Sequence, residues 1–522
     1  MENITILWAD DEIHLLKPQI LFLEKKGYTM ITVSNGHDAI DEIGKASNRI
    51  DVVFLDESMP GITGLETLSR IKEIAPNIPV VMITKNEEEG VMEQAIGSQI
   101  ADYLIKPINP VQILSTLRKI VDSDRLVREK TSTDYQQEFR NIFAAINSGL
   151  NHEAWAAIYK RIVHWELKLD ESKTNHLDQI VATQKEEANS EFCRYVQNNY
   201  LDWVKNEKNA PVMSHEVMRS MVFPDLSEAR PTVFVLLDNL RYDQWKIIEP
   251  IIAELYTVVE EETYMAILPT TTQYSRNAIF SGLMPSQIEE YYPDWWFNDM
   301  EKGGKNLHEK DLLGEQIRRT LRKPIRWDYV KITSNEDGKA LVENMNNYLN
   351  NTNFFAIVYN FIDMLSHART EMEILKELAS DEKAYRSLTR SWFLHSPIWE
   401  ALQQAAERDI QLFITTDHGS IRVGTPSKVV GDRETTTNLR YKVGKNLQYE
   451  KRDVFDIRKP ELALLPRPNV SSTFIFAKGD KFFLYPNNYN HYNNYYTDTF
   501  QHGGVSLEEM IVPFIKLQSK RK

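Results

Sequence analysis

The sequence predicts a multidomain α/β protein in which the α/β domains are built on parallel sheets. Short apolar runs of strand length recur along the chain, and many of them end in an Asp, Thr or Lys. Amphipathic stretches with helical spacing lie between these runs, and such alternation is typical of parallel β-α units. The 522 residues are too many for one ordinary core, so we expect about three domains.

Composition excludes several classes of protein. An apolar share of 42% favours globular folding over disorder. The net charge of −14 disfavours nonspecific binding to nucleic acid or anionic lipid. The single cysteine, Cys193, excludes an internal disulfide and fits a reducing compartment. Because no apolar run approaches about 18 residues and the first residues lack a basic, apolar leader, we expect a cytoplasmic protein without membrane insertion.

The first domain is predicted from buried strands that each end in a polar group. The strands are residues 4–9, 52–55, 80–83 and 103–105, and the groups that follow them are Asp10 and Asp11, Asp56, Thr84 and Lys106. The carboxyl ends of parallel strands meet at one edge of a sheet, so these groups should form one site. Three carboxylates suit Mg²⁺, which prefers oxygen ligands, and Lys106 and Thr84 suit a phosphoryl group beside them.

This segment resembles a two-component receiver domain over residues 1–121, and the resemblance implies a flavodoxin-like fold. It implies that a sensor histidine kinase phosphorylates Asp56, beside a Mg²⁺ held by Asp10, Asp11 and Asp56. The other roles carried over are Thr84 as switch hydroxyl, Tyr103 as switch aromatic and Lys106 as phosphate partner. The alternative is a flavodoxin-like domain whose carboxylates meet by chance, but every strand end carries the expected group. Lys85 departs from the pattern, since a small residue usually follows the threonine; we expect it to affect dephosphorylation or the kinase interface.

Residues 122–221 are predicted to form a helical bundle linker of three or four helices. Apolar residues fall there at helical spacing, for example at Phe139, Ile142, Phe143 and Ile146. Basic clustering and a short recognition helix are absent from the sequence of this segment, so a DNA-binding helix-turn-helix has little support. The sequence contains no glycine-rich phosphate loop, which disfavours an ATP-driven output.

The last domain is predicted from three apolar strands that each lead to a potential metal ligand. Residues 233–237 precede Asp238, residues 354–359 precede Asp363 and His367, and residues 412–416 precede Asp417 and His418; His502 lies in a turn further on. Asp and His without Cys suit Zn²⁺ or Mn²⁺ in a hydrolytic site with open positions. The alternatives are a helix cap for Asp238 and a helical ion pair between Asp363 and His367.

A hydroxyl nucleophile is predicted in the run Leu-Pro-Thr-Thr-Thr, residues 268–272. This run follows an apolar segment and precedes a helix start near residues 275–282. A threonine there would be metal-bound and aimed from a helix N-terminus, which also favours anions. Thr271, between the apolar segment and the helix start, is the threonine expected to fill this role. Thr270 and Thr272 are its internal controls, since neighbours on the same turn cannot all point at the site.

These residues together resemble the alkaline phosphatase superfamily, and two local motifs resemble its PglZ branch. The motifs are Asp-Asn-Leu-Arg-Tyr-Asp at 238–243 and Leu-Pro-Thr-Thr-Thr-x-x-Ser-Arg at 268–276. The resemblance implies an alkaline-phosphatase-like α/β domain with a central sheet over residues 222–522. It implies a phosphothreonine intermediate on Thr271, itself a metal ligand, and two zinc ions. One zinc would be held by Asp363, His367 and His502, and the other by Asp238, Asp417 and His418.

The predicted output is a phosphodiesterase, since the sequence shows no clear extra Mg²⁺ site of the monoesterase kind. Nucleotide or oligonucleotide phosphodiesters are the expected substrates. A basic stretch at 422–459 and a Tyr/Asn-rich stretch at 483–496 either hold such a strand or form a flexible cover, and the residues leave both open. His395 is a looser site candidate, with a core role favoured.

The whole arrangement resembles PorX-type response regulators. That resemblance implies control of type IX secretion, and the receiver resemblance implies a homodimer on phosphorylation. The alternatives are a phosphorylation-switched interaction scaffold with a non-catalytic metal domain, and a transcriptional regulator.

Overall fold

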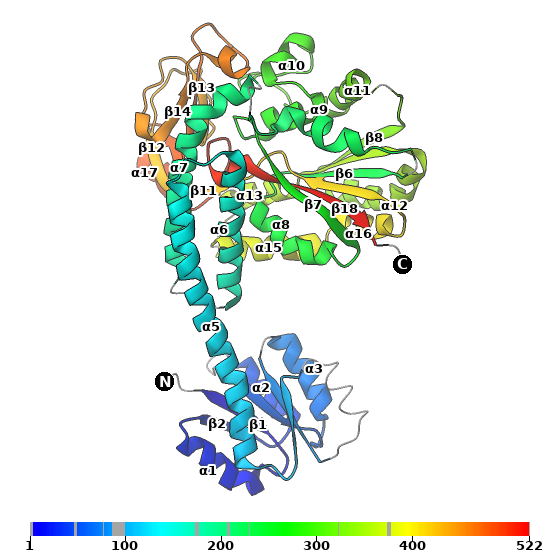
Figure 1. Cartoon of the computed structure of the whole chain (residues 1–522), viewed down its shortest axis with the longest axis vertical. Helices are drawn as coiled ribbons and strands as arrows, with labels where there is room; N and C mark the ends of the chain where they lie inside the picture. Colours follow the sequence, from blue (N-terminus) through cyan, green and yellow to red (C-terminus); the bar gives the residue numbers. More distant parts are fainter. Residues whose placement is uncertain are drawn as a thin grey trace. The chain divides into compact units, whose positions relative to one another are not determined.

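The structure is a computed structural model, and the chain divides into two compact units, Met1–Asp134 and Tyr135–Lys522 (Figure 1). It describes residues 4–45, 50–76, 78–85, 100–172, 177–205, 209–228, 230–321, 323–372, 377–379 and 381–520. Among these residues, no helix has the length and apolar character needed to cross a membrane. The first unit ends at Asp134, inside the long helix α5 (Pro110–Ile146), whereas the expected boundary lay at residue 121.

The first unit is a parallel five-stranded sheet in the order β2-β1-β3-β4-β5, which confirms the flavodoxin-like prediction. Strands β1 and β3 are almost wholly buried, as expected of a parallel sheet with helices on both faces. Alternate side chains fill two apolar clusters, so that Trp8 and Phe54 lie in one and Leu7 and Leu55 in the other. The elements are β1 (Thr5–Ala9), η1 (Ile13–Leu16), α1 (Lys17–Lys25), β2 (Thr29–Val33), α2 (Gly36–Gly44), β3 (Val52–Asp56), α3 (Gly64–Ile74), β4 (Val80–Thr84), β5 (Asp102–Ile105) and the first part of α5.

The second unit is organised by a six-stranded mixed sheet in the order β7-β18-β10-β6-β9-β8. The strands β10, β6, β9 and β8 are parallel, while β18 is antiparallel to both β10 and β7. Figure 1 shows α9 and α11 on one side of this sheet and α8, α15 and α16 on the other. The strands are β6 (Thr232–Leu237), β7 (Tyr256–Met265), β8 (Trp327–Ile332), β9 (Phe354–Tyr359), β10 (Gln411–Thr415) and β18 (Ile511–Ser519).

The helices around the sheet place the loops that follow its parallel strands. α13 begins directly after β9, and a five-residue π-helix, η5 (Thr272–Arg276), stands between the threonine run and α9. The helices are α8 (Tyr242–Ile252), α9 (Asn277–Ser281), α10 (Pro285–Tyr291), α11 (Glu309–Thr320), α12 (Asn335–Asn351), α13 (Phe361–Glu371), α15 (Glu382–Leu394), α16 (Pro397–Ala406) and α18 (Leu507–Met510).

The helices α6 (His152–Ser172) and α7 (Asp178–Val204) share the core of the second unit. Their apolar faces, including Tyr159 and Phe192, belong to the same cluster of buried residues as the strands β6 and β9. The short helices η2 (Ser214–Glu216), η3 (Met218–Val222) and η4 (Phe223–Asp225) then lead into β6. The predicted linker helices therefore pack as part of the output unit.

A smaller lobe of short strands, residues 421–501, lies beside the main sheet. The Tyr/Asn-rich stretch, expected as a loop, forms the helix α17 (Tyr489–Tyr496), in which no residue is buried. The lobe contains three small sheets, β11-β17, β12-β16 and β13-β15-β14. Its other elements are β11 (Ile421–Arg422), β12 (Thr425–Lys428), β13 (Tyr441–Gly444), η6 (Lys451–Asp453), β14 (Val454–Ile457), η7 (Pro460–Ala463), β15 (Thr473–Ala477), β16 (Lys481–Leu484) and β17 (Phe500–Gln501).

Candidate phosphorylation site and candidate metal centre

The carboxyl edge of the first sheet brings together the three predicted carboxylates. One oxygen of each of Asp10, Asp11 and Asp56 lies within 4.8 Å of the others. Lys106 Nζ lies 2.9 Å from Asp10 Oδ2 and 2.8 Å from Asp56 Oδ1. Burial raises the pKa of Asp56, and the charge of Asp10 adds to this, while Lys106 opposes it. An oxygen-only donor set of this kind fits Mg²⁺.

The rim of this site carries residues with switching or regulatory potential. Thr84 ends β4, and Tyr103, on β5, is exposed. Lys85 Nζ lies 3.0 Å from Glu12 Oε2, so the unusual lysine pairs across the rim with the loop that follows β1. Gly64 begins α3 close to the end of β3, where a Cβ would lie 2.5 Å from the Asp56 carbonyl oxygen.

In the second unit, α13 and the turn after β17 form the first of two predicted metal clusters. Asp363 Oδ2 lies 3.4 Å from His367 Nε2, and its Oδ1 lies 3.4 Å from His502 Nε2. Burial alone would raise the pKa of Asp363, but the two histidines outweigh it and hold that pKa well below its usual range. The Asp363 carboxylate raises the pKa of His367. One carboxylate thus holds two imidazoles that converge on it.

The second cluster lies at the carboxyl ends of β6 and β10, where Asp238, Asp417 and His418 bring ligand atoms within 4.8 Å of one another. All three are essentially buried. Burial raises the pKa of Asp238 well above its usual range, although Arg276 opposes this. Burial also lowers the pKa of His418 to about 4, which keeps its imidazole neutral and able to bind a metal.

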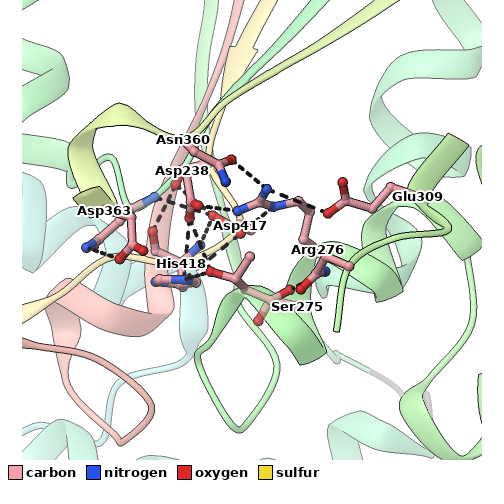
Figure 2. Close-up of polar contacts among 12 residues, drawn as sticks. Asp238, Ser275, Arg276, Glu309, Asn360, Asp363, Asp417 and His418 are labelled. Atoms are coloured by element: carbon pink, nitrogen blue, oxygen red, sulfur yellow. Dashed lines mark hydrogen bonds and ion pairs between the residues drawn. The ribbon is translucent and has the colours of Figure 1, made fainter. Parts of the chain in front are cut away.

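Arg276, from η5, binds both carboxylates of the second cluster (Figure 2). Its Nε donates to Asp417 Oδ2 at 2.9 Å, and its Nη2 donates to Asp238 Oδ2. Nη1 donates to Asn360 Oδ1 at 2.8 Å and lies 3.6 Å from Glu309 Oε1. The guanidinium is fully buried, so its position is set by this charged surround. Asp238 Oδ1 is left facing His418 Nε2 at 3.7 Å.

The two clusters adjoin one another. The rings of His418 and His502 stack with centroids 4.3 Å apart. Asn239, which follows Asp238, donates from Nδ2 to Asp363 Oδ1 at 3.3 Å and from its backbone to Asp417 Oδ1 at 3.4 Å. Six Asp and His donors in two neighbouring groups of three fit a pair of divalent cations such as Zn²⁺.

The three threonines of the run direct their hydroxyls to different partners. Thr272 Oγ1 donates to Asp238 Oδ1 at 3.3 Å and lies 3.2 Å from His418 Nε2. The Thr271 hydroxyl is buried and interacts with the Tyr441 hydroxyl, and its methyl group faces Gly503. Thr270 Oγ1 donates to the Gly504 carbonyl at 3.0 Å. Of the three threonines, Thr272 is thus the one whose hydroxyl contacts the second cluster, while Thr271 and Thr272 both line the cavity beside it.

A cavity of about 430 Å³ opens onto the first cluster and the threonines. Its wall is mostly hydroxyls, amides and carboxylates, and Lys305 is the one Lys or Arg among its lining residues. Asp299 in this wall accepts hydrogen bonds from Tyr274, at 2.5 Å, and from Tyr441. Such a polar, open cavity is suited to a charged ester rather than to an apolar ligand.

Several residues of the site carried no assigned role in the sequence. Arg276 stands in the quoted Ser-Arg motif. Asn239 is the second residue after β6 and Asn360 the first after β9, so for these two asparagines a position just after a strand was the only sequence signal. Arg241 and Asp243 form a buried ion pair, with Arg241 Nη2 2.6 Å from Asp243 Oδ2. His395 is exposed at the end of α15, outside both clusters, so the favoured core role does not hold.

Comparison with known families agrees with the domain content. A receiver-domain model, "Response regulator receiver domain", matches residues 6–118, and "PorX response regulator linker domain" matches residues 125–204. "BREX system PglZ alkaline phosphatase-like domain" matches residues 217–517, more than half of the chain.

The chain is similar to curated proteins over about a quarter of its length. It is 28% identical over 152 residues to the transcriptional regulatory protein ResD of Bacillus subtilis, covering 28% of this chain and 60% of ResD. It is 30% identical over 118 residues to the CpxR homolog of Haemophilus influenzae, covering 22% of this chain and 49% of that protein. The chain thus spans less than two thirds of these relatives. A solved structure, CheY4 of Vibrio cholerae, matches with 27% identity and a TM-score of 0.21, covering 23% of this chain and 98% of CheY4.

These matches cover nearly the whole chain in the order receiver, linker and output domain. The chain belongs to the PglZ alkaline phosphatase-like family and has the PorX-type response-regulator architecture.

Proposed function

We propose that this chain is a response regulator in which phosphorylation of Asp56 controls a two-zinc phosphodiesterase. The observation that carries the enzymatic part is the convergence of one hydroxyl on the metal cluster, Thr272 Oγ1 at 3.3 Å from Asp238 and 3.2 Å from His418. A metal domain that served only as a scaffold would have no need of a hydroxyl at this position.

Each residue of the site has a proposed role in an in-line displacement at phosphorus. Two cations held by Asp363, His367 and His502 and by Asp238, Asp417 and His418 would act as Lewis acids toward the attacking and leaving oxygens. Thr272 Oγ attacks phosphorus; its bond to phosphorus forms as the bond to the leaving oxygen breaks, and the threonine proton is lost to solvent. Water then attacks the phosphothreonine, and Thr272 regains a proton as the phosphate monoester leaves. Arg276 keeps the carboxylates of Asp238 and Asp417 oriented throughout.

Diesters are favoured over monoesters by the number of metal clusters. In the part of the second unit that the structure describes, two groups of three metal-ligating side chains occur, and a third beside them is not found. A monoester has one more negative charge to neutralise, and Lys305 is the one Lys or Arg lining the cavity. We propose nucleotide or oligonucleotide phosphodiesters as substrates, with a sensor histidine kinase as phosphodonor.

The wider role follows from the PorX-type architecture. We propose that the protein acts in the cytoplasm, that phosphorylation produces a homodimer, and that the output regulates type IX secretion. Mg²⁺ at Asp10, Asp11 and Asp56 would support phosphotransfer to Asp56, with Thr84, Tyr103 and Lys106 responding to the phosphoryl group.

The test compares turnover of bis(p-nitrophenyl) phosphate and p-nitrophenyl phosphate by the zinc-loaded full-length chain. We expect the diester to be hydrolysed faster, with about two zinc ions bound per chain. Two bound zinc ions without turnover of either ester, or of oligonucleotides, would favour the interaction scaffold. Preference for the monoester would overturn the diesterase assignment.

A further inference from the structure

One face of the linker helix α7 holds the segment that carries His502. Lys185, Asn189 and Cys193 are spaced four residues apart, so they lie on one side of the helix, and all three are buried. Lys185 Nζ lies 3.1 Å from Glu508 Oε1 and 3.1 Å from Glu166 Oε1 of α6. Cys193 Sγ donates to the Val505 carbonyl at 3.1 Å.

Asn189 makes the central pair of contacts in this seam. Its Nδ2 donates to Glu508 Oε2 at 3.0 Å, and its Oδ1 accepts from the Leu507 backbone amide at 2.7 Å. Both residues are buried, so the loss of either bond would leave a polar atom without its protein partner. Asn189 and Glu508 also line one wall of a cavity of about 880 Å³.

The held segment reaches both metal clusters within a few residues. The Gly503 amide donates to Thr270 Oγ1 at 3.0 Å, and His502 Nδ1 lies 3.3 Å from the Thr270 carbonyl. The Gly419 amide, next to His418, donates to the Glu509 carbonyl at 3.2 Å. A Cβ at Gly419 would lie 2.0 Å from the Glu508 carbonyl oxygen, so the backbone at Gly419 packs too closely against the backbone at Glu508 to admit a side chain.

The other face of the segment is clamped by an ion pair. Arg440 and Glu509 are both fully buried and lie 2.5 Å apart, and Glu509 Oε1 accepts from the Gly504 amide at 2.9 Å. The turn from His502 to Glu509 is therefore held between Arg440 on one side and α7 on the other.

We infer that Asn189, with Lys185, is a positioning residue for the His502 cluster and acts through Leu507 and Glu508. This inference rests on the proposed function, since it assigns the linker helix a part in setting the geometry of the proposed metal centre. The linker is then part of the enzyme, and a small movement of α7 is enough to change metal affinity at His502.

The test uses two substitutions on α7 of matched burial, in the full-length chain. Asn189→Leu removes both contacts to residues 507 and 508. Gln184→Leu is the control, because Gln184 is equally buried but bonds to Tyr135 and to the Phe139 carbonyl of α5, away from this segment. Asn189→Asp is a milder second variant; it keeps the acceptor for Leu507 but sets a carboxylate against Glu508.

Two measurements separate positioning from general destabilisation. Zinc affinity, from competition with a chelator, should fall about tenfold or more in both Asn189 variants and stay within about twofold in Gln184→Leu. Amide hydrogen exchange at Gly503 and Gly504 should quicken about tenfold in the Asn189 variants relative to the control, with metal present or removed.

Equal zinc affinity and equal exchange in Asn189→Leu and Gln184→Leu would overturn the inference and leave the proposed function standing. A wild-type chain that binds no zinc would overturn the proposed function. Exchange at Gly503 and Gly504 would then still decide whether α7 holds this turn.

Discussion

Replacing single hydroxyls in the threonine run separates the register found in the structure from the one expected of the sequence. Thr272→Val removes the hydroxyl that lies 3.3 Å from Asp238 and 3.2 Å from His418 while keeping the shape of the side chain. If Thr272 is the nucleophile, turnover of a diester should fall at least about 10³-fold, as for other enzymes that lose a covalent nucleophile. The two hydrogen bonds contribute about 0.5–1.5 kcal/mol each, so the fold should survive.

Thr271→Val is the matched neighbour. The Thr271 hydroxyl is buried and interacts with Tyr441, so a methyl group in its place removes about one hydrogen bond and leaves the contacts of Thr272 in place. We expect its free energy of unfolding to stay within about 1 kcal/mol of wild type, and its turnover to remain within about tenfold.

The assay measures diester turnover by zinc-loaded wild type and both variants at equal metal content, together with acid-quenched intact mass to detect a phosphothreonine. Only Thr272→Val should lack the phosphoryl adduct. Near-normal turnover in Thr272→Val with an inactive Thr271→Val would refute the reasoning from the hydroxyl contacts and restore Thr271 as the nucleophile.

Three further predictions follow from named contacts. His502→Ala removes one partner of Asp363, so the protein should lose about one equivalent of zinc, measured by elemental analysis, and most of its turnover. Full zinc occupancy in this variant would exclude His502 as a ligand. Beryllofluoride at Asp56 should convert the protein from monomer to dimer, as measured by light scattering, and raise diester turnover. If wild type and Asp56→Ala have the same mass and the same rate with and without beryllofluoride, the receiver only tethers the output domain. Burial lowers the pKa of Lys442 from about 10.5 to about 7. Between these two pH values the unfolded chain is protonated at this lysine and the native chain is not. Stability is then lost as pH falls toward 7, and Lys442→Met should stabilise the protein by about 3 kcal/mol more at pH 6 than at pH 9.5 in urea unfolding; a pH-independent gain would contradict this.

The sequence by itself determined which residues gather at each sheet edge. Asp10, Asp56 and Lys106 in the first sheet, and Asp238 and Asp417 in the second, all follow apolar runs of strand length. Parallel strands deliver the residues after them to one edge whatever the details of packing, so this placement is readable from a local pattern. Asp363 and His367 were accessible in the same way, because they follow a strand on the first turns of a helix.

The tertiary structure decided which atoms face one another. Three consecutive threonines share one pattern, and only the turn into η5 selects Thr272 for Asp238 and His418. The buried guanidinium of Arg276 binds Asp238 and Asp417, which are separated from it by 38 and 141 positions in the sequence. Asn189 binds Glu508, which lies 319 positions further along the chain. Such contacts depend on how buried polar groups find partners across the fold, and no local period or propensity encodes that choice.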